Sequence, residues 1–208
     1  MKNGGQNPNR LSLFAMLGLD PAKVYGLNQI HSQTVLAVGS GNPPMAEADG
    51  MVTRDNDITL SVTVADCLPV FLFDARTGAF GAVHSGWKGT GIAERALVLL
   101  RERWGTEPKD VAAVLGPCIG PCCYQIDAQR AALFEKEFGA DSVRESNGVF
   151  FLDLKAANIK ILSGAGVQNI AVCKACTFTD ERLGSFRREG QGYTRMAALA
   201  GAFDSRIL

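Results

Sequence analysis

The sequence has little of what marks a membrane protein or a nucleic-acid-binding protein. No apolar run approaches the ~20 residues that a membrane-spanning helix requires, and residues 1–20 are too polar before their short apolar stretch to be a signal peptide. The 21 basic and 21 acidic residues give a formal net charge of +0, which offers no electrostatic reason to expect nucleic acid or an anionic membrane as a partner. These absences predict a cytoplasmic globular protein.

Histidine is also scarce, whereas cysteine is not. The chain has two histidines, His31 and His84, and six cysteines. Without a secretion signal, six cysteines indicate free thiols in a reducing compartment, some of them available to bind a metal. Two histidines are too few for the additional copper centres of a multicopper oxidase.

The order of the predicted elements favours an α+β fold. Helical patterns cover 8–19, 90–104, 127–138 and 154–163, and strand patterns cover 27–38, 50–54, 58–74, 79–87, 111–116 and 169–174. Because strands often follow one another directly, a mixed layered fold is favoured over a doubly wound parallel sheet. Pro69 suggests an edge position or a bulge for its strand. With 208 residues, 47% of them hydrophobic, and no linker-like segment, we expect one domain over residues 1–208.

The pairing of two neighbouring strand patterns determines whether Cys67 and His84 lie close together. If 67–74 and 77–84 pair around a two-residue turn, Cys67 lies opposite His84; a four-residue loop at 75–78 makes the two diagonal neighbours on the same face. In either register a thiolate and an imidazole lie near enough to share a metal. A three-residue loop would place them on opposite faces of the sheet.

The residues themselves leave several interpretations of this pair open. Cys67 and His84 are either a buried thiol beside a structural histidine, or a nucleophile and its activating base in a thiol hydrolase. Alternatively, both are ligands of a zinc ion whose third protein ligand is His31, which gives the three-ligand, open-position pattern of catalytic zinc. Two histidines and a cysteine also suit blue copper, but the motifs supply no obvious axial methionine.

A glycine-rich loop follows His84. The stretch HSGWKGTG contains Gly86, Gly89 and Gly91 with Lys88 among them, and it runs into a predicted helix. Free amides at a helix start and a lysine charge can hold a phosphate, although a tight strand-to-helix turn uses the same residues. The loop LGPCIGPCCYQ, 115–125, similarly forms either a pocket wall or a simple turn.

Four further cysteines and the basic C-terminal stretch carry weaker signals. A structural zinc site could form from the cysteines of CKAC and of the Cys–Cys pair, although their spacing fits no established pattern: Cys122, Cys123, Cys173 and Cys176. Three arginines of the C-terminal stretch could meet an anionic substrate or could simply be surface charge: Arg187, Arg188 and Arg195.

Several stretches together resemble the YfiH/YlmD-like laccase-domain proteins. The motifs NQIHS, TVADCLPVFLFD, GAVHSGWKGTG, LGPCIGPCCYQID and SFRREGQGYTRMAAL occur in the order found in that family, over roughly residues 9–200. These proteins are described as purine nucleoside phosphorylases and were formerly described as multicopper polyphenol oxidases. The resemblance implies a single YfiH-like α+β domain with two stacked mixed β-sheets flanked by helices.

The resemblance also implies a cofactor, substrates and site residues. It implies Zn²⁺, rather than copper, held by His31, Cys67 and His84, and phosphorolysis of adenosine, inosine, guanosine or methylthioadenosine with an adenosine deaminase activity beside it. The partners are then a purine nucleoside and phosphate, and the protein is a monomer or a homodimer. The candidate catalytic residues are Asp66, Cys67 and His84, and the candidate substrate- and phosphate-binding residues are Gly86, Lys88, Gly89, Cys118 and Arg187.

The sequence departs from the family pattern in places. The usual N-terminal segment with its glycine-rich loop is expected to be missing, and Lys88, Gln125 and Thr194 stand where arginine, glutamate and glycine are common. Asp66 beside Cys67 suits proton transfer or orientation of the site, and equally a strand-end cap. Three other functions remain open: a Cys–His thiol hydrolase or amidase acting on peptidoglycan precursors, a polyphenol oxidase, and a non-enzymatic zinc-stabilised partner protein.

Overall fold

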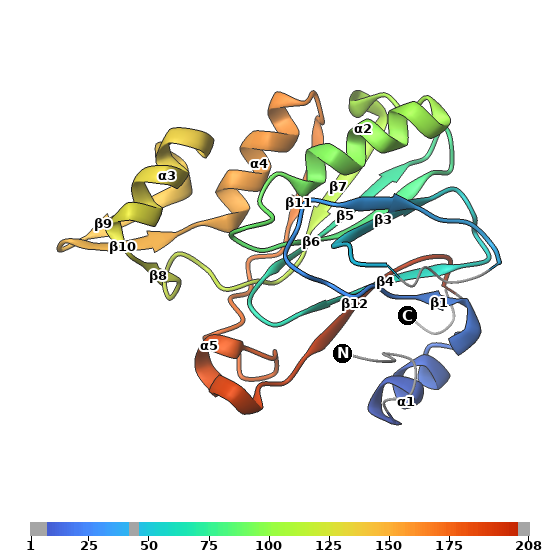
Figure 1. The fold of residues 1–208 in the computed structure, drawn as a ribbon, viewed down its shortest axis with the longest axis horizontal. Helices are drawn as coiled ribbons and strands as arrows, with labels where there is room; N and C mark the ends of the chain where they lie inside the picture. The colour runs from blue at the N-terminus through green and yellow to red at the C-terminus, as the bar shows by residue number, and fades with distance from the viewer. Residues whose placement is uncertain (1–7, 42–45, 204–208) are drawn as a thin grey trace.

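A six-stranded mixed sheet forms the centre of the computed structural model, which describes residues 8–41 and 46–203 (Figure 1). The strand order is β11-β7-β5-β6-β3-β2, and the two outer pairs, β11 with β7 and β2 with β3, are parallel. Its strands are β2 (Val35–Ala37), β3 (Gly50–Thr53), β5 (Leu68–Asp74), β6 (Phe80–Ser85), β7 (Val111–Leu115) and β11 (Asn169–Val172).

Two smaller sheets and five α-helices complete the described part of the fold. One sheet joins β1 (Val24–Tyr25), β4 (Thr59–Val64) and β12 (Met196–Ala200), and the other joins β8 (Gln125–Ile126), β10 (Val149–Leu152) and β9 (Val143–Ser146). The α-helices are α1 (Pro8–Met16), α2 (Ile92–Trp104), α3 (Ala128–Phe138), α4 (Leu154–Gly164) and α5 (Phe186–Glu189). Short 3-10 turns cover Pro21–Lys23, Pro108–Asp110, Ala140–Ser142 and Gly190–Gly192.

The central sheet is covered on both faces. On one face, Val70 and Leu72 pack against the buried stripe of α2, which includes Ile92, Ala96 and Leu100, and against α4. The sheet of β1, β4 and β12 lies on the other face (Figure 1). Its Leu60 belongs to a second buried cluster, together with residues of the central sheet such as Met51. Because both faces are covered, every residue of β6 is buried, which explains the apolar run from Phe80 to Val83.

Most predicted elements are confirmed by the structure, with a few corrections. The α+β fold with two stacked sheets is confirmed, and a third small sheet stands beside them under α3 (Figure 1). Asp153 caps α4, as its sequence position predicts, by accepting from the amide of Ala156. The strand predicted over 27–38 is wrong except at β2, and β12 was not predicted.

The prediction for Pro69 is also wrong, because β5 lies in the middle of the central sheet. Proline is tolerated there because it stands opposite Gly116, where β7 has already ended. The carbonyl of Pro69 still accepts from the amide of Gly116 at 2.9 Å, so the missing N–H of proline removes only the reciprocal hydrogen bond at the end of the ladder. Among the described helices, none is both long and apolar enough to cross a membrane.

Candidate functional site

The register of β5 and β6 brings Cys67 and His84 to one face. The pairs Leu68↔Ser85 and Pro69↔His84 belong to the register with a four-residue loop at 75–78, so that alternative is confirmed. The Asp74 side chain fixes the loop by accepting from the amides of Arg76 and Thr77. Continued by one residue, the same register sets Cys67 opposite Gly86, with His84 as its diagonal neighbour.

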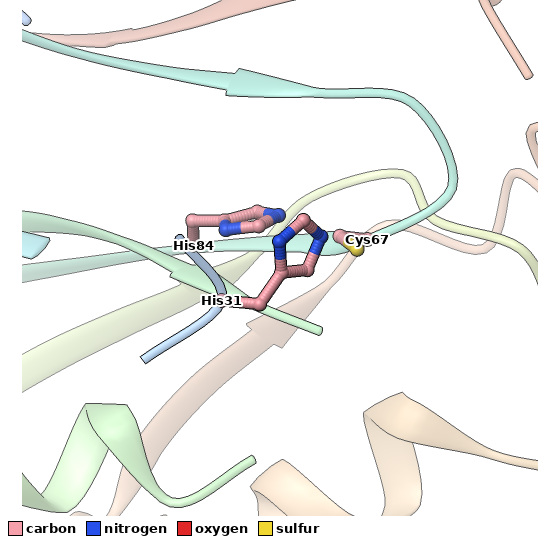
Figure 2. A group of neighbouring side chains, drawn as sticks. All are labelled: His31, Cys67 and His84. Carbon is pink, nitrogen blue, oxygen red and sulfur yellow. The ribbon is translucent and has the colours of Figure 1, made fainter. Parts of the chain in front are cut away.

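Three side chains from separate parts of the chain converge at this point. The ligand atoms of His31, Cys67 and His84 all lie within 4.8 Å of one another, and Figure 2 shows the two rings and the thiol turned toward a common centre. His84 comes from β6, Cys67 from the link between β4 and β5, and His31 from an irregular segment with positive φ (62°). The ring centroids of the two histidines are 4.8 Å apart.

Asp49, which lies in no motif of the sequence, organises this centre. Its side chain is fully buried, and its Oδ1 lies 2.8 Å from Nδ1 of His84. The same carboxylate accepts from the amides of His31 at 2.9 Å and Ser32 at 2.6 Å, and from that of Ile30 at 3.2 Å. Asp49 therefore folds the segment that carries His31 and leaves Nε2 of His84 free to face the thiol.

The charges of the centre support metal binding by a thiolate. Burial raises the pKa of the Cys67 thiol, but hydrogen bonds from His31 and His84 outweigh burial and lower the pKa to about 7. Burial lowers the pKa of His84, but hydrogen bonds with Asp49 and Cys67 outweigh burial and raise the pKa to about 9. For Asp49, burial raises the pKa, and the hydrogen bonds from His84, Ser32 and His31 bring it down to about 2.

This donor set suits a metal ion. A thiolate and two imidazole nitrogens are ligands that Zn²⁺ and copper ions accept, and a buried carboxylate behind a ligating histidine is the usual partner of its other nitrogen. His31 is exposed whereas His84 is 3% exposed, so solvent reaches the centre from the His31 side. Three protein ligands would leave one coordination position for a substrate.

Gly86 and Gly89, two glycines of the predicted loop, allow this loop to lie close to Cys67 and to the segment that carries His31. A Cβ on Gly86 would lie 2.9 Å from Sγ of Cys67 and 3.2 Å from the His31 ring. A Cβ on Gly89 would lie 2.7 Å from the carbonyl oxygen of Ser32. The loop is therefore a close-packed support for the metal-ligand centre, in addition to any contact with an anion.

Lys88 borders a cavity of about 290 Å³ beside this loop. The cavity lining combines aromatic, cationic and acidic side chains, which include Gln33, Trp87, Lys88, Thr90, Arg130 and Glu137. The Lys88 ammonium lies 5.4 Å from the Trp87 ring centroid and the Arg130 guanidinium 4.1 Å from it. Arg130 was not recognised in the sequence because it lies on the surface of α3, far along the chain from the glycine-rich loop.

Asp66 stands next to Cys67 but is held by other loops. Its Oδ1 accepts from the hydroxyl of Thr177 at 2.6 Å, its Oδ2 accepts from the amide of Arg187 at 2.7 Å, and its carbonyl accepts from Ile119 at 3.0 Å. Its backbone has a φ of 84°, which is rare for a residue other than glycine. Asp66 therefore joins three separate segments beside the metal-ligand centre.

The remaining two predicted residues differ in access. Cys118 is 1% exposed and lies in the main hydrophobic core, and burial raises the pKa of its thiol to about 12. The Arg187 guanidinium donates to the carbonyl of Gln125 at 3.3 Å and lies 5.3 Å from the Tyr124 ring. Arg187 is exposed, so a substrate can reach it, whereas Cys118 contributes packing at this location.

The fold and the convergence of two histidines and a cysteine define a mixed α+β protein with a candidate metal centre. The family model described as multi-copper polyphenol oxidoreductase laccase matches residues 6–202, and the chain belongs to this family. The resemblance to YfiH/YlmD-like laccase-domain proteins is thereby confirmed.

Curated relatives and solved structures agree with this assignment. The chain is 33% identical over 187 residues to a purine nucleoside phosphorylase of Corynebacterium glutamicum, a match that covers 88% of this chain and 76% of the relative. It is 35% identical to one of Deinococcus radiodurans, over 93% of this chain and 76% of that protein. The crystal structure of YlmD from Geobacillus stearothermophilus has a TM-score of 0.88 and 30% identity, with 94% of this chain and 79% of that one covered. Bacillus licheniformis YfiH has a TM-score of 0.86 and 29% identity, with 93% and 79% covered.

Proposed function

We propose that the protein is a zinc-dependent purine nucleoside phosphorylase. Its substrates would be inorganic phosphate and adenosine, inosine, guanosine or methylthioadenosine, with adenosine deaminase as a side activity. The observation that carries the proposal is the convergence of His31, Cys67 and His84 at a solvent-accessible point, in a chain whose curated relatives are named purine nucleoside phosphorylases.

The proposed zinc site follows from the donor atoms and their partners. Zinc would be held by the His31 ring, the Cys67 thiolate and Nε2 of His84, with Asp49 holding Nδ1 of His84. When bound, the ion would supply Lewis-acid positive charge beside the leaving purine. Asp66 is a positioning residue in this scheme, because both of its carboxylate oxygens are engaged by Thr177 and Arg187.

Phosphorolysis requires an anion held in line with the ribose. A phosphate oxygen forms a bond to ribose C1′, the C1′–N bond to the purine breaks, and its electron pair leaves with the purine, which takes up one proton. Lys88 and Arg130, both at the cavity beside the glycine-rich loop, are the cations that we assign to the phosphate. Arg187 and Tyr124 lie on the Asp66 side of the centre and are assigned to the nucleoside.

The test combines metal analysis with a product assay. Metal-loaded wild type is expected to bind zinc at the centre and to release free purine and ribose 1-phosphate from inosine only when phosphate is present. His31→Ala is expected to lose both properties, whereas Asn28→Ala, a change three residues away on the same segment, should keep them. Zinc-loaded wild type that releases ribose 1-phosphate from none of the purine nucleosides would overturn the proposal.

One observation favours a second candidate, a thiol hydrolase or amidase. Cys67, His84 and Asp49 form a chain in which the carboxylate holds Nδ1 of the histidine and the histidine lowers the pKa of the thiol. His31 separates the two proposals, because a hydrolase of this type does not need a second histidine. If His31→Ala keeps hydrolysis of a peptidoglycan precursor and a chelator has no effect, the thiol mechanism applies.

A further inference from the structure

A second group of sulfur atoms lies outside the centre described above. The Sγ atoms of Cys122, Cys123 and Cys176 all lie within 4.8 Å of one another, and those of Cys122 and Cys123 are 3.3 Å apart. Cys173, the other cysteine of the CKAC stretch, does not belong to this group. The structure therefore joins three of the four cysteines predicted as a possible zinc site, and we name these three the thiol cluster.

Parallel pairing of β7 with β11 brings the cluster together. The two loops that carry the cysteines leave the same ends of these adjacent strands. Beyond the strands, Cys118 and Cys176 form an isolated parallel bridge, and the amide of Thr177 donates to the carbonyl of Cys118 at 3.1 Å. The cluster is thus built on backbone hydrogen bonds between two fixed loops and does not depend on chance proximity of surface side chains.

The environment of Cys176 favours a thiolate. Its Sγ accepts from the amide of Gly120 at 3.2 Å, and the residue is buried. Backbone donors around a sulfur stabilise its negative charge, which is the form that binds a metal. Cys122 is exposed, so an ion can enter from solvent.

We propose that Cys122, Cys123 and Cys176 form a second metal site, a three-thiolate centre for a soft cation, and we assign it to Zn²⁺. Zn–S bonds of ~2.3 Å in a tetrahedral site separate neighbouring sulfurs by ~3.8 Å. The sulfurs of the cluster, at 4.8 Å or less, need only small side-chain shifts to reach that geometry. The fourth position remains for water or an external thiol.

The thiol cluster is connected to the first centre through Asp66. Ile119 lies three residues before Cys122 in its loop and Thr177 directly follows Cys176, and both hold Asp66 beside Cys67 by hydrogen bonds. A metal ion bound to the cluster would fix the two loops relative to each other and so fix Asp66. The site is a structural clamp on the loops around the first centre, and it does not depend on the reaction proposed above.

The first test counts metal ions by native mass spectrometry of zinc-loaded, reduced protein. Wild type is expected to carry two zinc ions. Cys176→Ser and Cys122→Ser/Cys123→Ser are expected to carry one, and so is His31→Ala/His84→Ala, which removes the other centre. Cys173→Ser, a cysteine outside the cluster, should keep two. A Cys176→Ser protein with the same zinc content as wild type would overturn the assignment.

Cadmium absorption provides a second readout that does not require the cysteine variants to fold, because it leaves the thiol cluster unchanged. The absorption band of thiolate-bound Cd²⁺ grows with the number of bound thiolates. The first centre supplies one thiolate and the thiol cluster three, so His31→Ala/His84→Ala should keep about three quarters or more of the wild-type absorbance. A band that vanishes in this variant would place all thiolate ligation at the first centre and refute the second site. A disulfide among the three cysteines in protein kept with a reducing agent would refute it as well.

Discussion

Asp49→Asn tests whether the buried carboxylate controls the metal centre. Asp49 accepts five hydrogen bonds: Oδ1 from the amide of His31 and from the His84 ring, and Oδ2 from the amides of Ile30 and Ser32 and from the Ser32 hydroxyl. An asparagine has one accepting oxygen, and its amide nitrogen must face one of these two sets of donors. The less costly orientation sets the nitrogen at the Oδ1 position.

In that orientation one backbone donor loses its acceptor and one histidine changes tautomer. The amide of His31 is left unpaired, which costs ~1–3 kcal/mol of unfolding free energy. The His84 ring must then accept from the new amide at Nδ1, so that its proton moves to Nε2, the nitrogen that faces Cys67. Loss of such a carboxylate partner typically weakens metal affinity ~10–100-fold.

The assay is competition for zinc against a chromophoric chelator, with Asp49→Asn and its wild-type reference both carrying Cys176→Ser so that only this centre binds zinc, together with denaturant unfolding of the metal-free protein. Asp57→Asn, the same chemical change at an exposed carboxylate, is the matched control and should leave both quantities unchanged within error. A zinc affinity within twofold of wild type in Asp49→Asn would refute the role of Asp49, even if the variant is less stable.

Three further predictions follow from the same contacts. In metal-free protein, the alkylation rate of the Cys67 thiol should be half-maximal near pH 7 and fall at lower pH, because the pKa of this thiol is about 7. Bound zinc should protect the thiol, and peptide mass mapping measures both effects. A half-maximal rate near pH 9 would contradict the contacts of Cys67 with the two histidines. Gly89→Ala should cost ~1–3 kcal/mol on denaturant unfolding, because its Cβ would meet the Ser32 carbonyl at 2.7 Å, whereas Gly39→Ala, with nothing within 4 Å, should change stability by less than ~0.5 kcal/mol. Lys88→Ala/Arg130→Ala should raise KM for phosphate ~10-fold, because it removes charged hydrogen-bond donors, and should leave zinc content unchanged; an unchanged KM would remove the cavity from the phosphate assignment.

The local patterns of this sequence were sufficient for much of the fold. The buried stripe of α2 and the Asp153 cap of α4 act through residues a few positions apart, so spacing alone predicted both elements. The hairpin question was also local: its possible loop lengths left two registers compatible with a shared metal, and Asp74 selects one of them.

The elements and site residues that the sequence did not predict depend on partners far along the chain. The segment around His31 has the alternation of a strand, but Asp49 and Gln29 bond its polar groups elsewhere: the Gln29 side chain pairs with both backbone groups of Thr63 in β4. Asp49 and Arg130 lie in stretches without a motif, and only the folded chain shows that they face His84 and Trp87. The prediction for Pro69 was wrong because β7 ends at Leu115, beside it, which limits the loss to one hydrogen bond at the end of the ladder.

The anchoring of the His31 segment has a consequence for the rate of metal exchange. This segment is held by the side chains of Gln29 and Asp49 and by an isolated backbone bridge at Asn28, rather than by a continuous ladder. We therefore expect it to detach while β5 and β6 remain paired. One ligand would then leave before the other two, and the dissociation rate of the ion would follow this local opening instead of global unfolding. Hydrogen exchange at the His31 and Ser32 amides would then share its rate with zinc release.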